Sequence, residues 1–256
     1  RMVHQAQNRS YMVSDAHLDT QWNWDIQTTI KDYVWNTISQ NLFLLKQYPE
    51  YIFNFEGAVK YAWMKEYYPA QYEEMKKFIE SGRWHISGAS WDATDTLVPS
   101  IESAIRNIML GQDYYRKEFG VESTDIFLPD CFGFGWTLPA IASHCGLIGF
   151  SSQKLQWRNK PFYGNDKYPF TVGLWQGIDG STIMMTHGYD YNQRFEDGDL
   201  SENKDLLELT GHSPLHMVYR YYGTGRHRRF TYIGVCTCRR ERLARQWSVA
   251  DCQCHE

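Results

Sequence analysis

Short apolar segments alternate with longer helical segments over the first three-fifths of the chain, and this order constrains the fold most strongly. A strand that is followed by a helix and then by another strand builds a parallel sheet, because the helix returns the chain to the end at which the first strand began. The sequence therefore predicts an α/β fold, a parallel sheet or barrel with its helices outside. Strands are predicted over 11–14, 51–55, 84–87, 124–128 and 147–151.

The helical segments between these strands carry their own start and stop signals. Pro49 ends the first helix, whose apolar stripe lies within 30–45. A glycine or proline bounds most of the others in the same way. The remaining helices are predicted over 60–81, 99–120 and 138–145, and a hairpin is predicted to join strands at 170–176 and 181–186.

Polar or aromatic functional groups stand at the carboxyl ends of several predicted strands. In α/β barrels and open parallel sheets these ends meet on one side of the fold, and the active site lies there. The sequence therefore predicts one site built from four strand ends. The residues are His17 and Asp19 after the first strand, Glu56 after the second, Trp91 and Asp92 after the third, and Asp130 after the fourth.

Composition excludes several classes of protein. The chain carries 26 Lys and Arg against 30 Asp and Glu, a formal charge of −4, which argues against binding of nucleic acid or of a membrane surface by charge. No apolar stretch approaches the ~20 residues of a membrane helix. With 43% hydrophobic residues the chain can bury a globular core. Aromatic residues reach 16%, and their rings suit a core and also a carbohydrate cleft.

The segment after the first strand contains an imidazole and a carboxylate two residues apart. In extended chain, residues i and i+2 face the same side, so His17 and Asp19 can present both groups to one metal ion. Imidazole nitrogen together with carboxylate oxygen suits zinc. Trp22 follows them and can offer its ring to a sugar. The alternative is a solvated loop in which the Asp is a cap.

Two further segments combine polar groups with glycine. An apolar strand leads into Asp130 and a turn rich in glycine and aromatic residues, whose backbone can approach a ligand closely. If the strand ends converge, Asp130 serves as a metal ligand and a nucleophile together; otherwise it ends a strand and caps the next turn. Tyr189 and Asp190 lie in the second segment, which suits sugar hydroxyls or forms a polar turn.

The order and spacing of these motifs resemble glycoside hydrolase family 38, the class II α-mannosidases, in a bacterial form. The resemblance covers residues 10–225 and is to the N-terminal part of the family's catalytic domain. Each anchor alone is a weak signal, whereas the set in this order is specific. The anchors are His17-Leu18-Asp19-Thr20-Gln21-Trp22, Gly88-Ala89-Ser90-Trp91-Asp92 with Glu102 beyond it, Leu128-Pro129-Asp130-Cys131-Phe132-Gly133, and Tyr189-Asp190.

The resemblance implies a distorted seven-stranded parallel β/α barrel of the glycoside hydrolase and deacetylase type, incomplete in this chain. It also implies a retaining hydrolase of terminal α-linked mannose, with Zn²⁺ or another divalent cation as cofactor and a mannose-containing oligosaccharide or glycan as substrate. By motif position, His17, Asp19 and Asp130 are the implied metal ligands, and Asp130 is also the implied nucleophile that forms a covalent glycosyl intermediate. The implied sugar-binding residues are Trp22, Trp91, Asp92, Tyr189 and Asp190.

The chain departs from the family's pattern near residue 225. Tyr222-Gly223-Thr224-Gly225 matches the family, but Arg226 follows where relatives have an Asp, the implied acid/base, and an arginine cannot donate that proton. The implied fourth metal ligand, a downstream His, is also missing. We therefore expect a catalytic domain over 1–225 and an atypical Arg- and Cys-rich tail over 226–256 that is frame-shifted or artificial; the alternative is a genuine extension.

Two other functions fit the same residues. A polysaccharide deacetylase-like hydrolase also places Asp and His metal ligands at strand ends and uses a metal-bound water as the nucleophile. A non-catalytic remnant would keep Trp22 as a sugar platform without turnover. The resemblance implies a secreted or periplasmic location, and the sequence specifies neither the linkage cleaved nor an oligomeric state.

Overall fold

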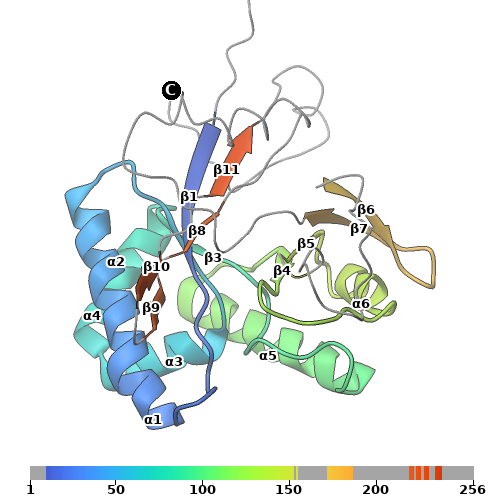
Figure 1. Ribbon diagram of the computed structural model, residues 1–256, viewed down its shortest axis with the longest axis horizontal. Coiled ribbons are helices and arrows are strands. Elements are labelled where there is room, and N and C mark those ends of the chain that lie inside the picture. Colours follow the sequence, from blue (N-terminus) through green and yellow to red (C-terminus); the bar gives the residue numbers. More distant parts are fainter. Residues whose placement is uncertain are drawn as a thin grey trace, which may run out of the picture.

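The computed structural model describes residues 10–152, 154 and 172–186, together with four short strands between residues 219 and 237. Within this part of the chain, two main sheets lie side by side, and helices pack beside each of them (Figure 1). The helices in these ranges are too short or too polar to cross a membrane.

Parallel pairing builds the first sheet, as the sequence predicts. The register sets Ala16 opposite Phe55, so the residues that follow, His17 and Glu56, leave the sheet at the same end. One edge of the first strand also pairs with two strands from the far end of the chain. In this sheet β1 (Ser10–Ala16), β2 (Phe53–Phe55) and β3 (Trp84–Ile86) are parallel, β8 (Tyr219–Tyr221) is parallel to β1, and β11 (Gly234–Thr237) is antiparallel to β1.

The second sheet combines parallel strands with a hairpin. The hairpin predicted around Gly177 and Gly180 is confirmed, since the Gly177 N–H donates to the Ser181 carbonyl across the turn at 2.8 Å. In this sheet β4 (Asp125–Phe127), β5 (Gly149–Ser151) and β7 (Thr182–Thr186) are parallel, and β6 (Val172–Gln176) is antiparallel to β7. A separate pair is formed by β9 (Gly223–Gly225) and β10 (Arg228–Phe230).

The two sheets are joined where the end of β3 approaches β4. The Ala89 N–H donates to the Asp125 carbonyl at 2.9 Å, and the Gly88 N–H donates to the Asp125 carboxylate at 3.1 Å. Gly88 has a φ of +74°, a conformation that other residues rarely adopt, and a Cβ there would meet Phe127 at 3.4 Å. The parallel order β1-β2-β3 therefore continues into β4-β5-β7 through loop contacts rather than through a strand ladder.

The fold class is thus mixed α/β with parallel sheets, and the seven-stranded parallel barrel is not confirmed. The described strands form separate small sheets, and β6 and β11 run antiparallel to their neighbours. Most of these strands have only three residues, too short to form the long ladders that close a barrel.

The predicted helices are present, and Pro69 divides one of them. The sequence predicts a single helix over 60–81, but proline has no N–H to donate and begins a second helix instead. Ser100 caps the longest helix by accepting from the Ser103 N–H at 3.2 Å, and Gly120 ends it in the left-handed region. The helices are α1 (Ile26–Thr28), a π-helical segment (Thr29–Val34), α2 (Trp35–Gln47), α3 (Ala58–Tyr67), α4 (Pro69–Glu80), α5 (Ile101–Phe119) and α6 (Leu138–His144).

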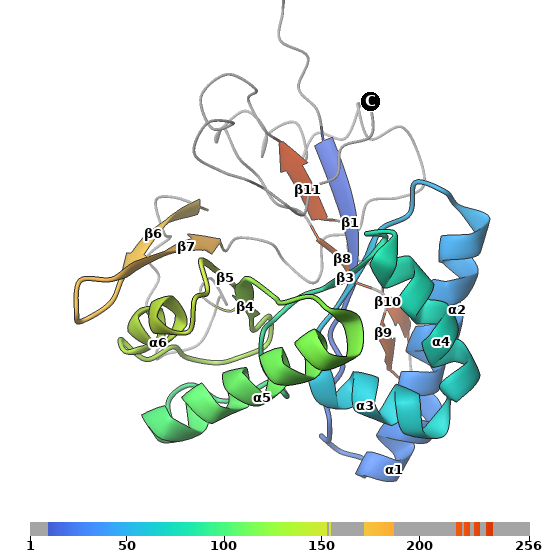
Figure 2. The same cartoon turned by 180° about the vertical axis from the view of Figure 1, so that it is seen from behind.

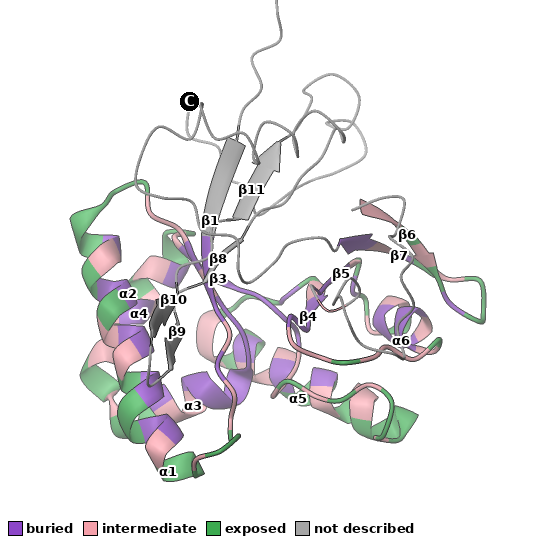
Figure 3. Ribbon diagram, in the orientation of Figure 1, coloured by how far each residue is buried: buried purple, intermediate pink, exposed green. Residues whose placement is uncertain are grey.

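Opposite views show that α2, α3 and α4 gather beside the first sheet, whereas α6 lies beside the second and α5 extends between the two groups (Figures 1 and 2). The helix faces that point toward the sheets are buried, and their outward faces are exposed (Figure 3). The predicted stripe within 30–45 is buried accordingly. On α5, Ile108 and Tyr115 are buried, but Ile101 at the first turn is 53% exposed.

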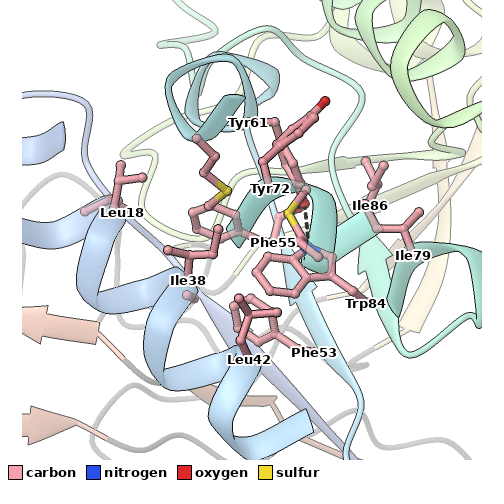
Figure 4. Close-up of a cluster of buried hydrophobic side chains, with 14 of the residues drawn as sticks. Leu18, Ile38, Leu42, Phe53, Phe55, Tyr61, Tyr72, Ile79, Trp84 and Ile86 are labelled. Atoms are coloured by element: carbon pink, nitrogen blue, oxygen red, sulfur yellow. Dashed lines mark hydrogen bonds between the residues drawn. The ribbon is translucent and has the colours of Figure 1, made fainter. Parts of the chain in front are cut away.

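Aromatic side chains fill the core between the first sheet and its helices. Trp84 Nε1 donates to the Tyr61 hydroxyl at 3.0 Å, and that hydroxyl donates to the Phe55 carbonyl at 2.9 Å (Figure 4). An unpaired buried hydroxyl or indole N–H would cost about 1–3 kcal/mol, so this chain of bonds lets large rings with polar atoms enter the core. The core holds β2 and β3 in register and thereby fixes where their carboxyl ends lie.

Gly111 in α5 lies against the backbone that follows β3. A Cβ at Gly111 would stand 2.2 Å from the Ala89 carbonyl oxygen and 2.6 Å from the Trp91 nitrogen, and backbone atoms cannot rotate away. We expect Gly111→Ala to destabilise the protein by about 3 kcal/mol through overpacking, measured as a lower urea midpoint by circular dichroism. Gly120→Ala is the control, because a Cβ there meets nothing within 4 Å and only roughly 1 kcal/mol of backbone strain arises. Equal midpoints for the two variants would contradict this packing.

Candidate active site

His17 leaves the end of β1 and places its ring between two carboxylates. Nδ1 donates to Glu56 Oε1 at 2.6 Å, and Nε2 lies 3.3 Å from Asp19 Oδ1. Because a carboxylate oxygen accepts hydrogen bonds, the proton of the short contact is assigned to Nδ1. Glu56 is 3% exposed and Asp19 is much more accessible, so the ring bridges a buried acid and a surface acid.

The two carboxylates determine the charge of the ring. Burial lowers the pKa of His17, but the charge of Glu56 and the hydrogen bonds that the ring donates to Asp19 and Glu56 outweigh burial and raise the pKa to about 10. Burial raises the pKa of Asp19, while its bond with His17 and the charges of His17 and Lys60 lower that pKa below its usual value. Without another cation, His17 therefore stays protonated at neutral pH.

Asp15 adds a carboxyl that the sequence analysis did not single out. It is 4% exposed, and no hydrogen-bond partner for its Oδ1 lies within the described part of the chain. Burial and then the charge of Glu56 raise the pKa of Asp15 well above its usual value. The signal was present in the sequence, because Asp15 lies two residues before His17 and strand residues at this spacing share a face.

Asp92 connects the loop after β1 with the loop after β3. The Thr20 hydroxyl donates to Asp92 Oδ2 at 2.5 Å, and the ammonium of Lys60, a fully buried residue of α3, lies 3.3 Å from Asp92 Oδ1. Asn107 of α5 holds the Asp92 backbone by a bond to its N–H and another to its carbonyl. A buried lysine is costly unless it is paired, so Asp92 and Lys60 form a fixed unit rather than a solvated loop.

Asp130 stands after β4 and contacts a lysine from the segment after β5. Lys154 Nζ lies 2.5 Å from Asp130 Oδ1 and 4.9 Å from the centre of the Phe132 ring. Lys154 is mostly buried, so the attraction between the ammonium and the carboxylate is only weakly screened. Lys154 and Lys60 were not predicted from the sequence, because residue type alone does not distinguish a buried, paired lysine from an exposed one.

Burial and several negative charges raise the pKa of the Cys131 thiol. Burial raises the pKa of Cys131 to about 12, helped by the negative charges of Glu56, Asp95, Asp130 and Asp19. These acids follow four different segments of the chain, three of them at strand ends. Their charges act on this thiol, whereas the meeting of the strand-end carboxylates in one site stays a prediction.

A divalent metal fits this region in the chemistry of its donors and, in the described residues, only partly in its geometry. His17 and Asp19 supply an imidazole nitrogen and a carboxylate that face each other. Asp130 is held by Lys154, and no set of three His, Cys, Asp or Glu side chains in the described ranges is arranged to hold one ion. The three-residue ligand set of the sequence analysis stays a prediction.

The predicted sugar-binding residues have different surroundings. Trp22 is 72% exposed and meets the edge of Trp24 with ring centres 5.8 Å apart, so one large ring is available at the surface. Trp91 is partly buried and packs edge-on against Tyr114 at 5.8 Å. Tyr189 and Asp190 lie outside the described residues.

Comparison with known proteins gives consistent matches to one family. The sequence pattern of the glycosyl hydrolases family 38 N-terminal domain matches residues 7–229. Alpha-mannosidase G of Dictyostelium discoideum is 34% identical over 209 residues, which cover 79% of this chain and 19% of that protein. Alpha-mannosidase 2C1 of Homo sapiens is 31% identical over 183 residues, which cover 71% of this chain and 17% of that protein. The chain thus spans less than a fifth of the length of these relatives.

A solved structure shows the same fold. The crystal structure of an alpha-mannosidase from Enterococcus faecalis V583 superposes with a TM-score of 0.64 at 19% identity. The superposition covers 79% of this chain and 23% of that one. At this identity the likeness establishes the arrangement of the elements and not the chemistry of the side chains.

The raised pKa of His17 predicts how the stability of the metal-free chain depends on pH. The pKa is about 10 in the folded chain against 6.5 for an ordinary histidine, so protonated His17 contributes stability that is fully present below about pH 6.5 and is lost as the pH rises through about 10. After treatment with a chelator, we expect the urea midpoint to fall more steeply between pH 7 and pH 10.5 in the wild type than in His17→Gln. The exposed His144, changed to Gln, is the matched control. Parallel pH curves for wild type and His17→Gln would show that the ring is not charged.

Proposed function

This chain belongs to glycosyl hydrolase family 38, and from that premise we propose that it forms the catalytic part of a retaining α-mannosidase that hydrolyses terminal α-linked mannose. The observation that carries the proposal is that β1 and β2 end at the same level, where Glu56 and Asp19 flank the ring of His17 at 2.6 Å and 3.3 Å, while Asp130 follows β4 in the neighbouring sheet. A retaining glycosidase needs an ionised carboxylate next to the anomeric carbon and a proton donor about 5–5.5 Å away. Strand-end acids of this kind supply the first requirement.

Asp130 is the nucleophile in this proposal. The ammonium of Lys154, 2.5 Å from Asp130 Oδ1, restricts the orientation of the carboxylate oxygens. One oxygen of Asp130 bonds to the anomeric carbon as the glycosidic bond breaks, and the leaving oxygen takes a proton from an acid. Water then gives a proton to the deprotonated acid and attacks the same carbon, which releases mannose with retained configuration and returns the electron pair to Asp130.

His17, Asp19 and Asp130 would hold the divalent cation, and their nitrogen and oxygen donors favour Zn²⁺. Bound there, the ion supplies a Lewis acid for the hydroxyls of the mannose ring. The chain's own contribution is to bring the donors together: Asp19 lies 3.3 Å from the Nε2 of His17. Trp22, with its exposed ring, is the proposed stacking platform for the sugar, and Asp92, Trp91, Tyr189 and Asp190 are proposed to line the pocket.

The proton donor is proposed to lie outside this chain's residues 1–225. Among the described residues Asp15 is the carboxyl with a strongly raised pKa, but at 4% exposure it has no access to a leaving group. In this proposal, residues 1–225 form the catalytic domain and residues 226–256 form an atypical tail. The coding DNA tests it: a frame shifted near codon 226 should restore an Asp followed by glycines, and failure to do so contradicts a frame-shifted tail.

Replacing the nucleophile should abolish turnover and weaken metal binding together. We expect Asp130→Ala to reduce hydrolysis of an aryl α-mannoside by more than about a thousandfold, with a lower zinc content in the same sample. The assay uses the full chain and a chain that continues past residue 225 in the correct frame. Asp179→Asn is the control, because this Asp lies in the β6–β7 turn, outside the site.

Mass spectrometry separates the competing outcomes. A fluorinated α-mannosyl fluoride should leave a mannosyl adduct on the peptide that contains Asp130. Unchanged rate and metal content in Asp130→Ala would refute both roles of this residue. Release of acetate from an acetylated polysaccharide, without mannoside hydrolysis, would point to a deacetylase instead. If the correctly framed, folded chain hydrolyses none of the mannosides tested, the mannosidase assignment is contradicted.

A further inference from the structure

Glu56 takes no part in the bond changes proposed for the site, yet it contacts the ring of His17 at 2.6 Å. We infer that Glu56 is the positioning residue for His17: it holds Nδ1–H so that Nε2 is presented to a divalent cation on the side of Asp19. This inference rests on the proposed function, because it concerns the metal ligand proposed there. The inference gives Glu56, the residue that follows β2, the task of orienting the His17 ring.

The geometry gives the ring one orientation. Nδ1 lies 2.6 Å from Glu56 Oε1, and the opposite nitrogen lies 3.3 Å from Asp19 Oδ1. A histidine that binds a metal usually donates its other N–H to a carboxylate or a carbonyl, which fixes both the tautomer and the direction of the free lone pair. With Glu56 as the acceptor at Nδ1, Nε2 is the nitrogen that faces Asp19, the proposed oxygen ligand, at 3.3 Å.

The backbone places Glu56 there with little freedom. Ala16 and Phe55 are opposite each other in the parallel β1–β2 ladder, so His17 and Glu56 are the next residues of the two strands. Gly57 then turns the chain with a φ of +83°, and a Cβ on it would stand 2.7 Å from Lys60 Nζ. The turn after Glu56 thus accommodates a buried ammonium, and the acid is fixed on both sides.

The surroundings of Glu56 argue for a task beyond joining two strands. It is 3% exposed, and its carboxylate contacts the ring of His17 at 2.6 Å. Burying a carboxylate costs free energy, and a bond between β1 and β2 could be made without any charge. A carboxylate at this position is explained by the need to hold a ring nitrogen that carries a proton while the other nitrogen binds a cation.

The test measures zinc affinity of the full chain at one pH by competition with a chromophoric chelator. Glu56→Leu removes the acceptor and is expected to weaken zinc binding about 10–100-fold. Glu56→Gln keeps an acceptor oxygen at the same reach and should lose less than about tenfold, whereas Glu56→Asp keeps the charge but withdraws the oxygens by one methylene and should bind less tightly than Glu56→Gln. Glu80→Leu, an exposed acid at the end of α4, is the control and should bind as the wild type does.

A spectroscopic readout separates positioning from general support of the fold. In the zinc-loaded wild type and in Glu56→Gln, the ¹⁵N imidazole shifts of His17 should show a protonated Nδ1 and a metal-bound Nε2, and Glu56→Leu should lose this pattern. If Glu56→Leu does not fold, the order of Glu56→Gln above Glu56→Asp decides, because that order follows the reach of the acceptor and not the charge.

Three results would overturn the inference: full zinc affinity in a folded Glu56→Leu, an affinity of Glu56→Asp equal to or above that of Glu56→Gln, or a wild type that binds no zinc. The proposed function fails differently. A wild type that binds zinc with the expected order of variants but hydrolyses no mannoside would contradict only the mannosidase assignment.

Discussion

The site depends on one arrangement, the ring of His17 held between Glu56 and Asp19. It arises because β1 and β2 are parallel and in a register that ends both strands at the same level. The aromatic core behind the sheet supports that register: Trp84 donates to the Tyr61 hydroxyl, and that hydroxyl donates to the β2 backbone at Phe55. A packing defect far from the ring would therefore move the acid relative to the imidazole, since a one-residue slip in a parallel ladder turns every side chain to the other face.

Charge balance explains the other contacts. The acids of this region are paired or buried: Lys60 contacts Asp92, Lys154 contacts Asp130, His17 lies between Glu56 and Asp19, and burial raises the pKa of Asp15. Each of these arrangements lowers the free-energy cost of burying carboxylates where water screens their charges poorly. A fold selected only for stability could use apolar residues at these positions, so the concentration of paired acids is itself an argument for chemistry at this end of the sheets.

The sequence predicts those features of the fold and site that depend on the order of residues along short segments. Strand and helix positions followed from periodicity, and His17, Asp19 and Asp130 followed from their places after strands. Pro69 was overlooked because apolar periodicity continues through it, although proline ends a helix by its missing N–H. The barrel could not be confirmed from strands of three residues, whose pairing depends on tertiary contacts such as the one between Ala89 and Asp125. Lys60 and Lys154 were missed because their burial depends on tertiary structure and cannot be read from residue type.

The same balance constrains how a cation would enter. As described, the positive charge at this site consists of the proton on His17 and the ammonium groups of Lys60 and Lys154. A divalent ion that bound Nε2 would have to displace the proton, and one that also bound Asp130 would compete with Lys154 for the same oxygen. Glu56 alone would keep its contact through that exchange, because it holds the nitrogen that faces away from Asp19. The fixed element of the site is therefore the buried Glu56–His17 contact, and the outer contacts are the ones that can be replaced.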